Sequence, residues 1–438
     1  MSSTDFDRLS QSLSTGVHFN EHLSTCSWIG FTLLTILLAF RIFKPDPLAH
    51  IPAVGGTGSI YRVPDKDRWH IIVSRADQIK EFFKTPDDIL SVNGYIDTTF
   101  FISYLMGPTL MSNLYHVGIV RSQLNRNLGT IFNDLRNEIH IAFDDNIRPT
   151  DDWTAIHAYP KMVEVVARAS NRIFVGLPMY ACYRPRTGIS QNQYRLCFEY
   201  KLSKSVAIAA KHLGPVIKER QDKIDAYGHD YPEKPVDILS WLMEEAVGEE
   251  RSIENLTKRI LSLNFAAVHT TSMVLCPSSH SEGLLIIYLQ TFTSALYHLA
   301  AEPHYIPPMR EEIERVIAEE GWTKTAMTKM RKLDSFLKEN LRHNVIHFVS
   351  SAGLTLKDFT FSDGTVIPKG SVVSAAVHPA HYNEENYPDS EKFDGFRYAK
   401  IRAQDGYNNT NQLVNTSLDY LSFGHGKHAC PGRFFAGK

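Results

Sequence analysis

A short stretch near the C-terminus constrains this chain most, because it surrounds one cysteine with glycines. It runs from Phe423 to Gly432, reads FGHGKHACPG, and places Cys430 near its end. Glycine adopts a positive φ without a Cβ penalty, so such a loop can turn tightly and bring its backbone close to a flat ligand. Backbone amides directed at the sulfur, and a nearby cation, favour the ionised cysteine. The loop therefore predicts a thiolate that binds a metal, and the alternative is a buried structural cysteine in a glycine-rich turn.

The pattern Phe423-x-x-Gly426-x-His428-x-Cys430-x-Gly432 resembles the haem-binding loop of the cytochrome P450 monooxygenases. The resemblance implies that haem b is the cofactor and that Cys430 is the axial thiolate ligand of its iron, where it favours O–O cleavage. It also implies that Phe423, Gly426 and Gly432 shape the loop. His428 stands where arginine is more usual and is expected to bind a haem propionate. The expected fold is mainly α-helical with small β-sheets.

The length would allow two or three domains, but one large helical domain with a sizeable core is also possible. The 438 residues are 43% hydrophobic and carry a net charge of -2, which gives no sign of a nucleic-acid partner. The five cysteines form no CxxC pair and no disulfide ladder, which fits a reducing compartment.

An apolar segment over residues 24–44 follows a polar tail over 1–23 and precedes a proline- and glycine-rich stretch over 45–57. Its apolar run from Trp28 to Phe43 approaches the roughly 20 residues that span a bilayer. A cleaved signal peptide is the alternative, but the start is not basic and no small-residue cleavage site is evident. We therefore expect a lumenal tail, a single transmembrane helix and a hinge, followed by a haem domain over 58–438.

Charges beside this segment predict its orientation. Arg41 and Lys44 lie at its C-terminal end, whereas the preceding tail carries Arg8 as its one strong base. Positive residues near a membrane helix favour the cytosolic side. The catalytic domain is therefore expected in the cytosol, anchored to the endoplasmic reticulum membrane.

Regular elements are readable along much of the chain. Short apolar runs predict strands between Ile60 and Val73, and helices are expected over Ala76–Phe83 and Ile208–Tyr227. Phe361–Val373 carries turn signals at Asp-Gly and Pro-Lys-Gly and predicts a hairpin.

A basic helix is expected over Tyr115–Leu128. It resembles the family helix whose basic residue binds a haem propionate. Arg121 is the first candidate for that role, and His116 and Arg126 follow. The alternative for each of the three is an ordinary solvated helix face.

Asn255–Met273 is expected to form one long apolar helix that contains the sequence AAVHTT at 266–271. This sequence resembles the oxygen-binding turn of the family, where two small residues let the helix approach the haem. The resemblance implies that the Thr270 hydroxyl relays protons during oxygen activation, assisted by His269, which stands where an acid is usual. Ordinary helix packing is the alternative.

Residues 274–290 interrupt the helical pattern, because they place Pro277 and Gly283 where a helix should continue. Deleting them restores an apolar helical pattern. Valine codons begin with GT and a glutamine codon can end in AG, so the segment has the ends of an intron. A translated, retained intron and a true loop insertion are the two explanations.

Glu339 and Arg342 are spaced i, i+3 on a predicted helix, close enough to pair. Most such pairs are surface salt bridges of little value. The resemblance implies that this pair instead binds Arg397 from a later loop and anchors the core on the haem side.

Together these motifs predict a membrane-tethered haem-thiolate monooxygenase. The resemblance implies that it oxidises an apolar small molecule, with a terpenoid of fungal secondary metabolism as one substrate class. Electrons are expected from NADPH through NADPH-cytochrome P450 reductase, which Lys427 and Arg433 would face.

Two competing hypotheses come from other classes. Family members continue well past the cysteine, so the chain is expected to be truncated at its C-terminus. It would then be an incompletely folded, catalytically inactive product of a mis-spliced monooxygenase gene. A helical interaction protein without haem is the other hypothesis.

Overall fold

The computed structural model describes residues 46, 48–53, 59–65, 68–152, 154–176, 202–269, 291–345, 349–404 and 410–437. The chain divides into two compact units, Met1–Pro52 and Ala53–Lys438. In the first unit, the amide of Ile51 closes a short turn by donating to the carbonyl of Leu48. Among the described residues, no helix is both long enough and apolar enough to cross a membrane. The tail over 1–23 and the predicted anchor over 24–44 lie outside them.

A five-stranded sheet has the order β1-β2-β7-β4-β3. Strands β1 and β2 form an antiparallel pair, β7 lies parallel to β2, and β4 runs antiparallel to β7. The central strand β7 is buried at all five positions, because it is covered on both faces. The strands are β1 (Ile60–Pro64), β2 (Trp69–Val73), β3 (Leu90–Ser91), β4 (Val349–Thr355) and β7 (Val372–Ala376).

A small second sheet pairs β5 (Phe359–Thr360) with β6 (Val366–Ile367) in a hairpin. Turns form at both predicted positions. The amide of Gly364 donates to the carbonyl of Phe361, and the amide of Ser371 donates to the carbonyl of Pro368. The predicted hairpin is therefore present, and its distal part is the turn that leads into β7.

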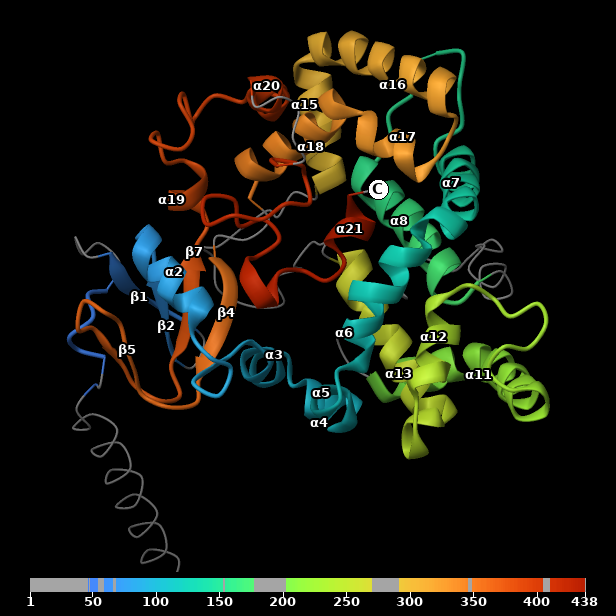
Figure 1. Cartoon of the computed structure of the whole chain (residues 1–438), viewed down its shortest axis with the longest axis horizontal. Helices are drawn as coiled ribbons and strands as arrows, with labels where there is room; N and C mark the ends of the chain where they lie inside the picture. The colour runs from blue at the N-terminus through green and yellow to red at the C-terminus, as the bar shows by residue number, and fades with distance from the viewer. Residues whose placement is uncertain are drawn as a thin grey trace, which may run out of the picture. The chain divides into compact units, whose positions relative to one another are not determined.

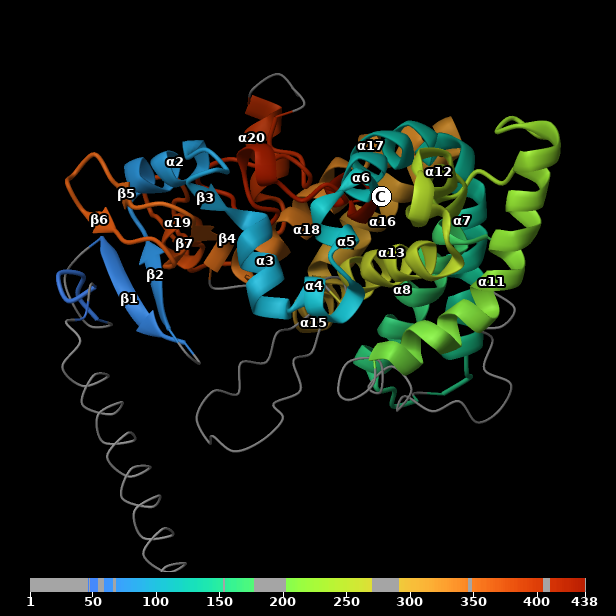
Figure 2. The same cartoon turned by 90° about the horizontal axis from the view of Figure 1, so that it is seen from below.

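In the first half of the chain, α2 and α3 lie against the sheet, and the helices from α4 onward lie to one side of it (Figures 1 and 2). The predicted helix over Ala76–Phe83 is found as α2. The helices and helical turns of the first half are α2 (Ala76–Lys84), α3 (Val92–Phe100), α4 (Ile102–Met106), α5 (Thr109–Ser112), α6 (Tyr115–Ile119), the π turn η1 (Val120–Leu124), α7 (Asn125–Asn146), α8 (Ala158–Phe174), α11 (Leu202–Tyr227), α12 (Ile238–Glu245), the 3₁₀ turn η2 (Gly248–Arg251), α13 (Ile253–Asn264) and the π turn η3 (Phe265–His269).

The largest part of the core lies among these helices. Helix α7 buries Leu128, Ile131, Phe132 and Leu135, whose spacing of three and four residues makes one apolar stripe. Leu128, Ile131 and Leu135 of this stripe pack in a cluster with residues of α6, α8, α11, α12 and α13. Helix α13 begins at its N-cap Ser252, whose side chain accepts from the amide of Asn255.

Helices of the second half complete the domain. Their aromatic core contains Tyr305, Phe336 and Phe393. They are α15 (Thr291–Ala301), the 3₁₀ turn η4 (Pro303–Tyr305), α16 (Ile306–Glu320), α17 (Lys324–Lys329), α18 (Arg331–His343), α19 (His378–His381), α20 (Arg397–Gln404), the 3₁₀ turn η5 (Gly426–His428) and α21 (Arg433–Ala436). The prediction of a mainly helical fold with small sheets is confirmed.

Two predicted helices differ in detail from the structure. The helix expected over 115–128 is interrupted by the π turn η1, and the helix expected over 255–273 changes from α to π geometry after Asn264. A π turn holds one more residue than an α turn, and apolar periodicity over so few residues does not reveal it.

Candidate active site

The loop that carries Cys430 is closed by its own backbone. The amide of Cys430 donates to the carbonyl of Phe423 over 2.8 Å, and the amide of Ala429 donates to the carbonyl of Gly426 over 3.2 Å. Gly424 and Gly426 have φ values of 67° and 65°, the left-handed conformation that glycine adopts without strain. The tight turn that the glycines predict is therefore formed, and it leaves Cys430 at its end.

The side chain of Cys430 is a partly buried free thiol. Burial raises its pKa, whereas hydrogen bonds from the backbone amides of Gly432 and Arg433, and the positive charge of Arg433, act in the opposite direction. Amide donors at the sulfur stabilise the thiolate over the thiol. A metal cation bound at the sulfur would lower this raised pKa, so the amide donors fit a thiolate ligand of a haem iron.

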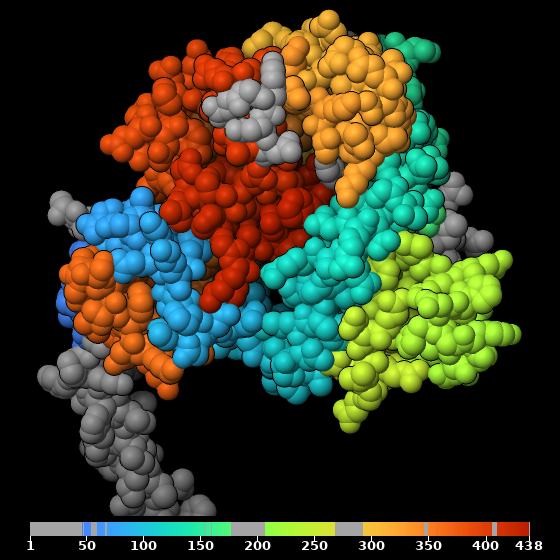
Figure 3. Space-filling view, in the orientation of Figure 1, coloured from blue at the N-terminus to red at the C-terminus, as the bar shows by residue number. Residues whose placement is uncertain are grey.

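One apolar cluster brings together the two helices predicted to flank the cofactor and α21, the short helix after the cysteine loop. It contains Val120 of η1, Ala267 of η3 and Phe435 of α21. A Cβ on Gly432 would lie 3.9 Å from Val120, and Arg121 Nη2 donates to the carbonyl of Lys427 over 3.3 Å. Figure 3 shows the red C-terminal segment against the cyan segment that contains α6. The basic helix therefore packs directly on the cysteine loop.

The candidate propionate ligands have different surroundings. Arg121 is exposed at the edge of the loop, and Arg126 is exposed at the start of α7. His428 Nε2 lies 2.7 Å from Asp87 Oδ1, which also pairs with Lys427 Nζ at 2.7 Å. Sequence reasoning missed Asp87, because nothing in the segment after α2 indicates its distant partners.

His116, the other candidate, is buried rather than at the loop surface. Its Nδ1 accepts a hydrogen bond from Arg259 of α13 over 2.8 Å. Burial, and next the charge of Arg259, lower the pKa of His116 to about 4. Its role toward a propionate, like those of Arg121, Arg126 and His428, stays a prediction.

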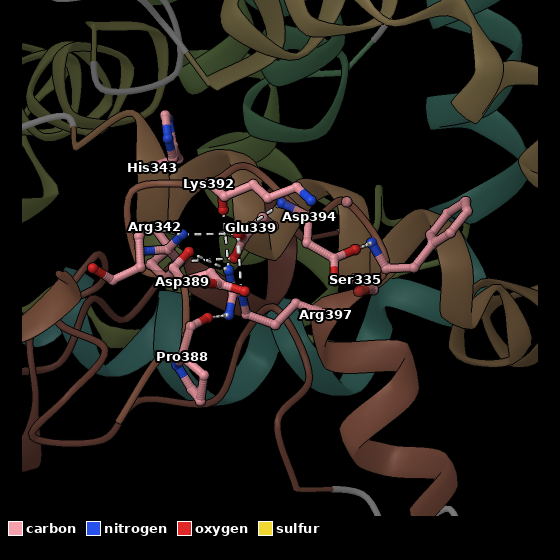
Figure 4. Close-up of polar contacts among 12 residues, drawn as sticks. Ser335, Glu339, Arg342, His343, Pro388, Asp389, Lys392, Asp394 and Arg397 are labelled. Carbon is pink, nitrogen blue, oxygen red and sulfur yellow. Dashed lines mark hydrogen bonds and ion pairs between the residues drawn. The ribbon is translucent and has the colours of Figure 1, made fainter. Parts of the chain in front are cut away.

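The structure brings Glu339, Arg342 and Arg397 together, as Figure 4 shows. Glu339 and Arg342 are fully buried. The two carboxylate oxygens of Glu339 accept from Arg342 Nε and Nη2, each over 2.8 Å, and from Arg397 Nε over 3.1 Å. Arg397 also donates to the carbonyl of Pro388 over 2.7 Å. This triad ties α18 to the loop that leads into α20.

His381 links the triad to the segment that leads into the cysteine loop, and sequence reasoning missed it. Its Nδ1 donates to the carbonyl of Arg342 over 3.1 Å, and its Nε2 accepts from the amide of Leu421 over 2.9 Å. Its ring stacks on that of Tyr420 at a centroid distance of 5.4 Å. Burial lowers the pKa of His381 to about 4, so the ring is neutral. No sequence pattern around 381 distinguishes this histidine from an exposed one.

The predicted proton-transfer residues are described only in part. His269 is the last residue of η3, and only its backbone is described; Thr270 and the insertion over 274–290 lie outside the described residues. The π turn widens the helix at Ala266 and Ala267, the two small residues expected to approach the cofactor. Such turns occur frequently at functional sites.

A cavity of about 420 Å³ lies beside Arg433. Its lining is mostly polar, which does not suit an apolar substrate, and it includes none of the residues of η3. The lining residues are Lys338, Thr410, Asn411, Val414, Asn415, Thr416, Ser417 and Arg433.

The helical domain, the glycine-turned cysteine loop with amides at its sulfur, and the buried triad define a protein of the haem-thiolate class. A model of the cytochrome P450 family matches residues 289–437. Cytochrome P450 monooxygenase 151 of Postia placenta is 38% identical over 426 residues, covering 92% of this chain and 82% of the relative. The chain belongs to the cytochrome P450 family and is, by family, a cytochrome P450 monooxygenase.

Two further similarities agree with this family. Cytochrome P450 monooxygenase CYP512U6 of Ganoderma lucidum is 32% identical over 459 residues, covering 93% of this chain and 86% of the relative. The solved structure of retinoic acid-bound cyanobacterial CYP120A1 matches with a TM-score of 0.57 and 20% identity, covering 86% of this chain and 81% of that one. At 20% sequence identity, this match supports the fold alone. The predicted family is confirmed.

Proposed function

We propose that this protein binds haem b through the Cys430 thiolate and oxidises an apolar small molecule with O₂ and electrons from NADPH. The observation that carries the proposal is the cysteine loop, whose amides stabilise the sulfur and which contacts η1 through Val120 and Arg121. When bound, the haem supplies the activation of O₂. The alternative of an incompletely folded product receives less support, because the triad and the clusters around the loop are formed.

We propose the remaining roles from the family resemblance. Arg121 and His428, with His116 and Arg126 behind them, bind the carboxylates of the cofactor. Thr270 and His269 hold and deliver protons on the oxygen side. Glu339, Arg342 and Arg397 hold the scaffold beneath the loop.

We further propose NADPH-cytochrome P450 reductase as the electron donor and the endoplasmic reticulum membrane as the location. The apolar segment over 24–44 and the basic residues Arg41 and Lys44 support a single-pass anchor with a cytosolic domain. Lys427 and Arg433, close to Cys430, suit an acidic reductase surface. A terpenoid of fungal secondary metabolism is the proposed substrate class, supported by the fungal origin of the relatives.

The absorption spectrum of the reduced, carbon-monoxide-bound protein tests the haem-thiolate assignment. We expect a strongly red-shifted Soret band in the wild-type chain and its loss in Cys430→Ser, because a hydroxyl does not replace the thiolate. Cys182→Ser, a change at another cysteine of the chain, serves as the control and keeps the band. Absence of haem, or an unchanged band in Cys430→Ser, contradicts the proposal.

A further inference from the structure

A buried polar network joins His116 of α6 to helix α13. Arg259 is 2% exposed and donates through Nη1 to His116 Nδ1 over 2.8 Å and to the carbonyl of Asn113 over 2.9 Å. Its Nη2 donates to Glu250 Oε1 over 2.8 Å. The guanidinium also lies over the ring of Tyr115, 4.0 Å from the centroid. Arg259 is therefore held on several sides and cannot move freely away from His116.

This contact fixes which nitrogen of His116 carries the proton. A guanidinium has only N–H donors and stays protonated in proteins, so Nδ1 must accept. A neutral imidazole that accepts at Nδ1 carries its proton on Nε2. The pKa of His116, lowered to about 4, keeps the ring neutral at cellular pH. Within the described ranges, no group accepts a hydrogen bond from Nε2.

The position of His116 along its helix relates this N–H to the cofactor site. Val120 lies four residues further on, which puts it on the same helix face. Val120 is the residue beside Gly432, and Arg121 donates to the carbonyl of Lys427. His116 is therefore one helical turn from the contact between this helix and the cysteine loop.

We propose that Arg259 is a positioning residue that occupies His116 Nδ1, so that the Nε2–H of His116 donates to a carboxylate of the cofactor, a haem propionate. Glu250 holds Arg259 in turn. The inference rests on the proposed function, because the acceptor belongs to a haem bound at Cys430. It assigns Arg259, whose polar partners among the described residues all lie outside the cysteine loop, to the binding of the cofactor through His116.

The test uses a double variant that removes the buried ion pair without leaving one charge unpaired, Arg259→Gln with Glu250→Gln. The matched control is Arg220→Gln with Asp237→Asn, a buried pair at 2.7 Å whose contacts include no histidine. We expect haem transfer to apomyoglobin to become about tenfold faster in the Arg259 variant, as for the loss of one buried hydrogen bond. The propionate bending band in the resonance Raman spectrum should shift as well, and the control should change neither.

His116→Phe provides the second arm, since it removes the same donor directly. Combined with the Arg259 variant, it should lose haem no faster than His116→Phe alone, because both changes act through one hydrogen bond. Additive effects, an unchanged Raman band, or equal effects of the control overturn the proposal. Arg259→Lys is the milder replacement if the double variant does not fold.

The tautomer itself gives an independent measurement. In ¹⁵N-histidine-labelled protein in the diamagnetic ferrous carbon-monoxide form, the signal missing from His116→Phe should have the Nε2–H tautomer. His381 is an internal reference, because it donates from Nδ1 and accepts at Nε2. An Nδ1–H tautomer for His116 in a protein that shows the red-shifted Soret band rejects this inference and leaves the proposed function supported. A chain without a red-shifted Soret band rejects both.

Discussion

The carboxylate of Glu339 is fully buried and accepts from Arg342, from Arg397 and from the amide of Asp394. Glu339→Gln removes the negative charge and leaves the buried Arg342 uncompensated. Breaking a buried pair in this way costs about 3–5 kcal/mol. We therefore expect the free energy of unfolding to fall by about that amount in a urea titration followed by circular dichroism.

An exposed ion pair provides the control for this variant. Arg315 and Glu319 pair at 3.2 Å on α16, and both side chains are more than half exposed. Glu319→Gln should cost less than about 0.5 kcal/mol, because solvent screens such pairs. If the free energy of unfolding falls equally in Glu339→Gln and Glu319→Gln, burial of the ion pair is not what determines the loss of stability.

Residue motifs that lie close together in sequence were predictable, and distant partnerships were not. The spacing around Cys430 and the i, i+3 pair of Glu339 and Arg342 are local, so the sequence carries them directly. Arg259 lies 143 residues from His116, and Asp87 lies 341 residues from His428. The local sequence around a single polar residue in a helix or turn does not indicate which distant residue it pairs with.

At the scale of elements, the start of α13 matters because this helix carries Arg259 and continues into η3. Its N-cap Ser252 accepts from the amide of Asn255 over 3.3 Å. Ser252→Ala removes this acceptor and should lower the free energy of unfolding by about 1 kcal/mol, measured in the same titration.

A serine inside a helix gives the matched control. Ser122 of η1 donates its hydroxyl to the carbonyl of Gly118 over 2.7 Å, a bond that does little for a helix. Ser122→Ala is expected to be neutral within about 0.5 kcal/mol. If Ser122→Ala costs as much as Ser252→Ala, capping is not the cause of the loss.

Apolar periodicity predicted the positions of α2 and α11, and turn signals predicted the hairpin of β5 and β6. It did not predict the π turns η1 and η3, which share one apolar cluster with α21, the short helix after the cysteine loop. An extra residue in one turn depends on tertiary packing, and a short apolar pattern fits both helix types. The elements with altered geometry are thus those nearest the candidate site.

Across the whole molecule, His116 and His381 make stability depend on pH. Both have a pKa lowered to about 4, mainly by burial, against about 6.5 for an unfolded histidine. Between these values the unfolded chain binds more protons, so the free energy of unfolding decreases as the pH falls. The contribution of each neutral, buried histidine to the free energy of unfolding is on the order of 3 kcal/mol. It is complete above about pH 6.5 and disappears toward about pH 4.

Urea titrations at pH 7.5 and pH 5 measure this dependence. His381→Asn should have a smaller difference between the two pH values than wild type, because one buried titrating group is gone. His140→Gln, at an exposed histidine on α7, should keep the wild-type difference. An undiminished difference in His381→Asn would assign the pH dependence to other groups.

The family resemblance predicted the fold class, whereas the strand order of the sheet could not be derived from the chain. Strand β2 pairs with β7, and His70 lies opposite Val372. Hydrophobic alternation identifies each strand but does not specify a partner that is hundreds of residues away.

The same pairing of β2 with β7 has a consequence for synthesis on the ribosome. The hairpin of β1 and β2 is made early, yet the strand that covers its second edge is made only after most of the chain has been translated. Contacts over such a sequence separation form late, because they must first close a long loop. During this interval the inner edge of β2 is an unpaired strand edge that can recruit other nascent chains, so chaperone protection of this hairpin is most important before β7 is translated.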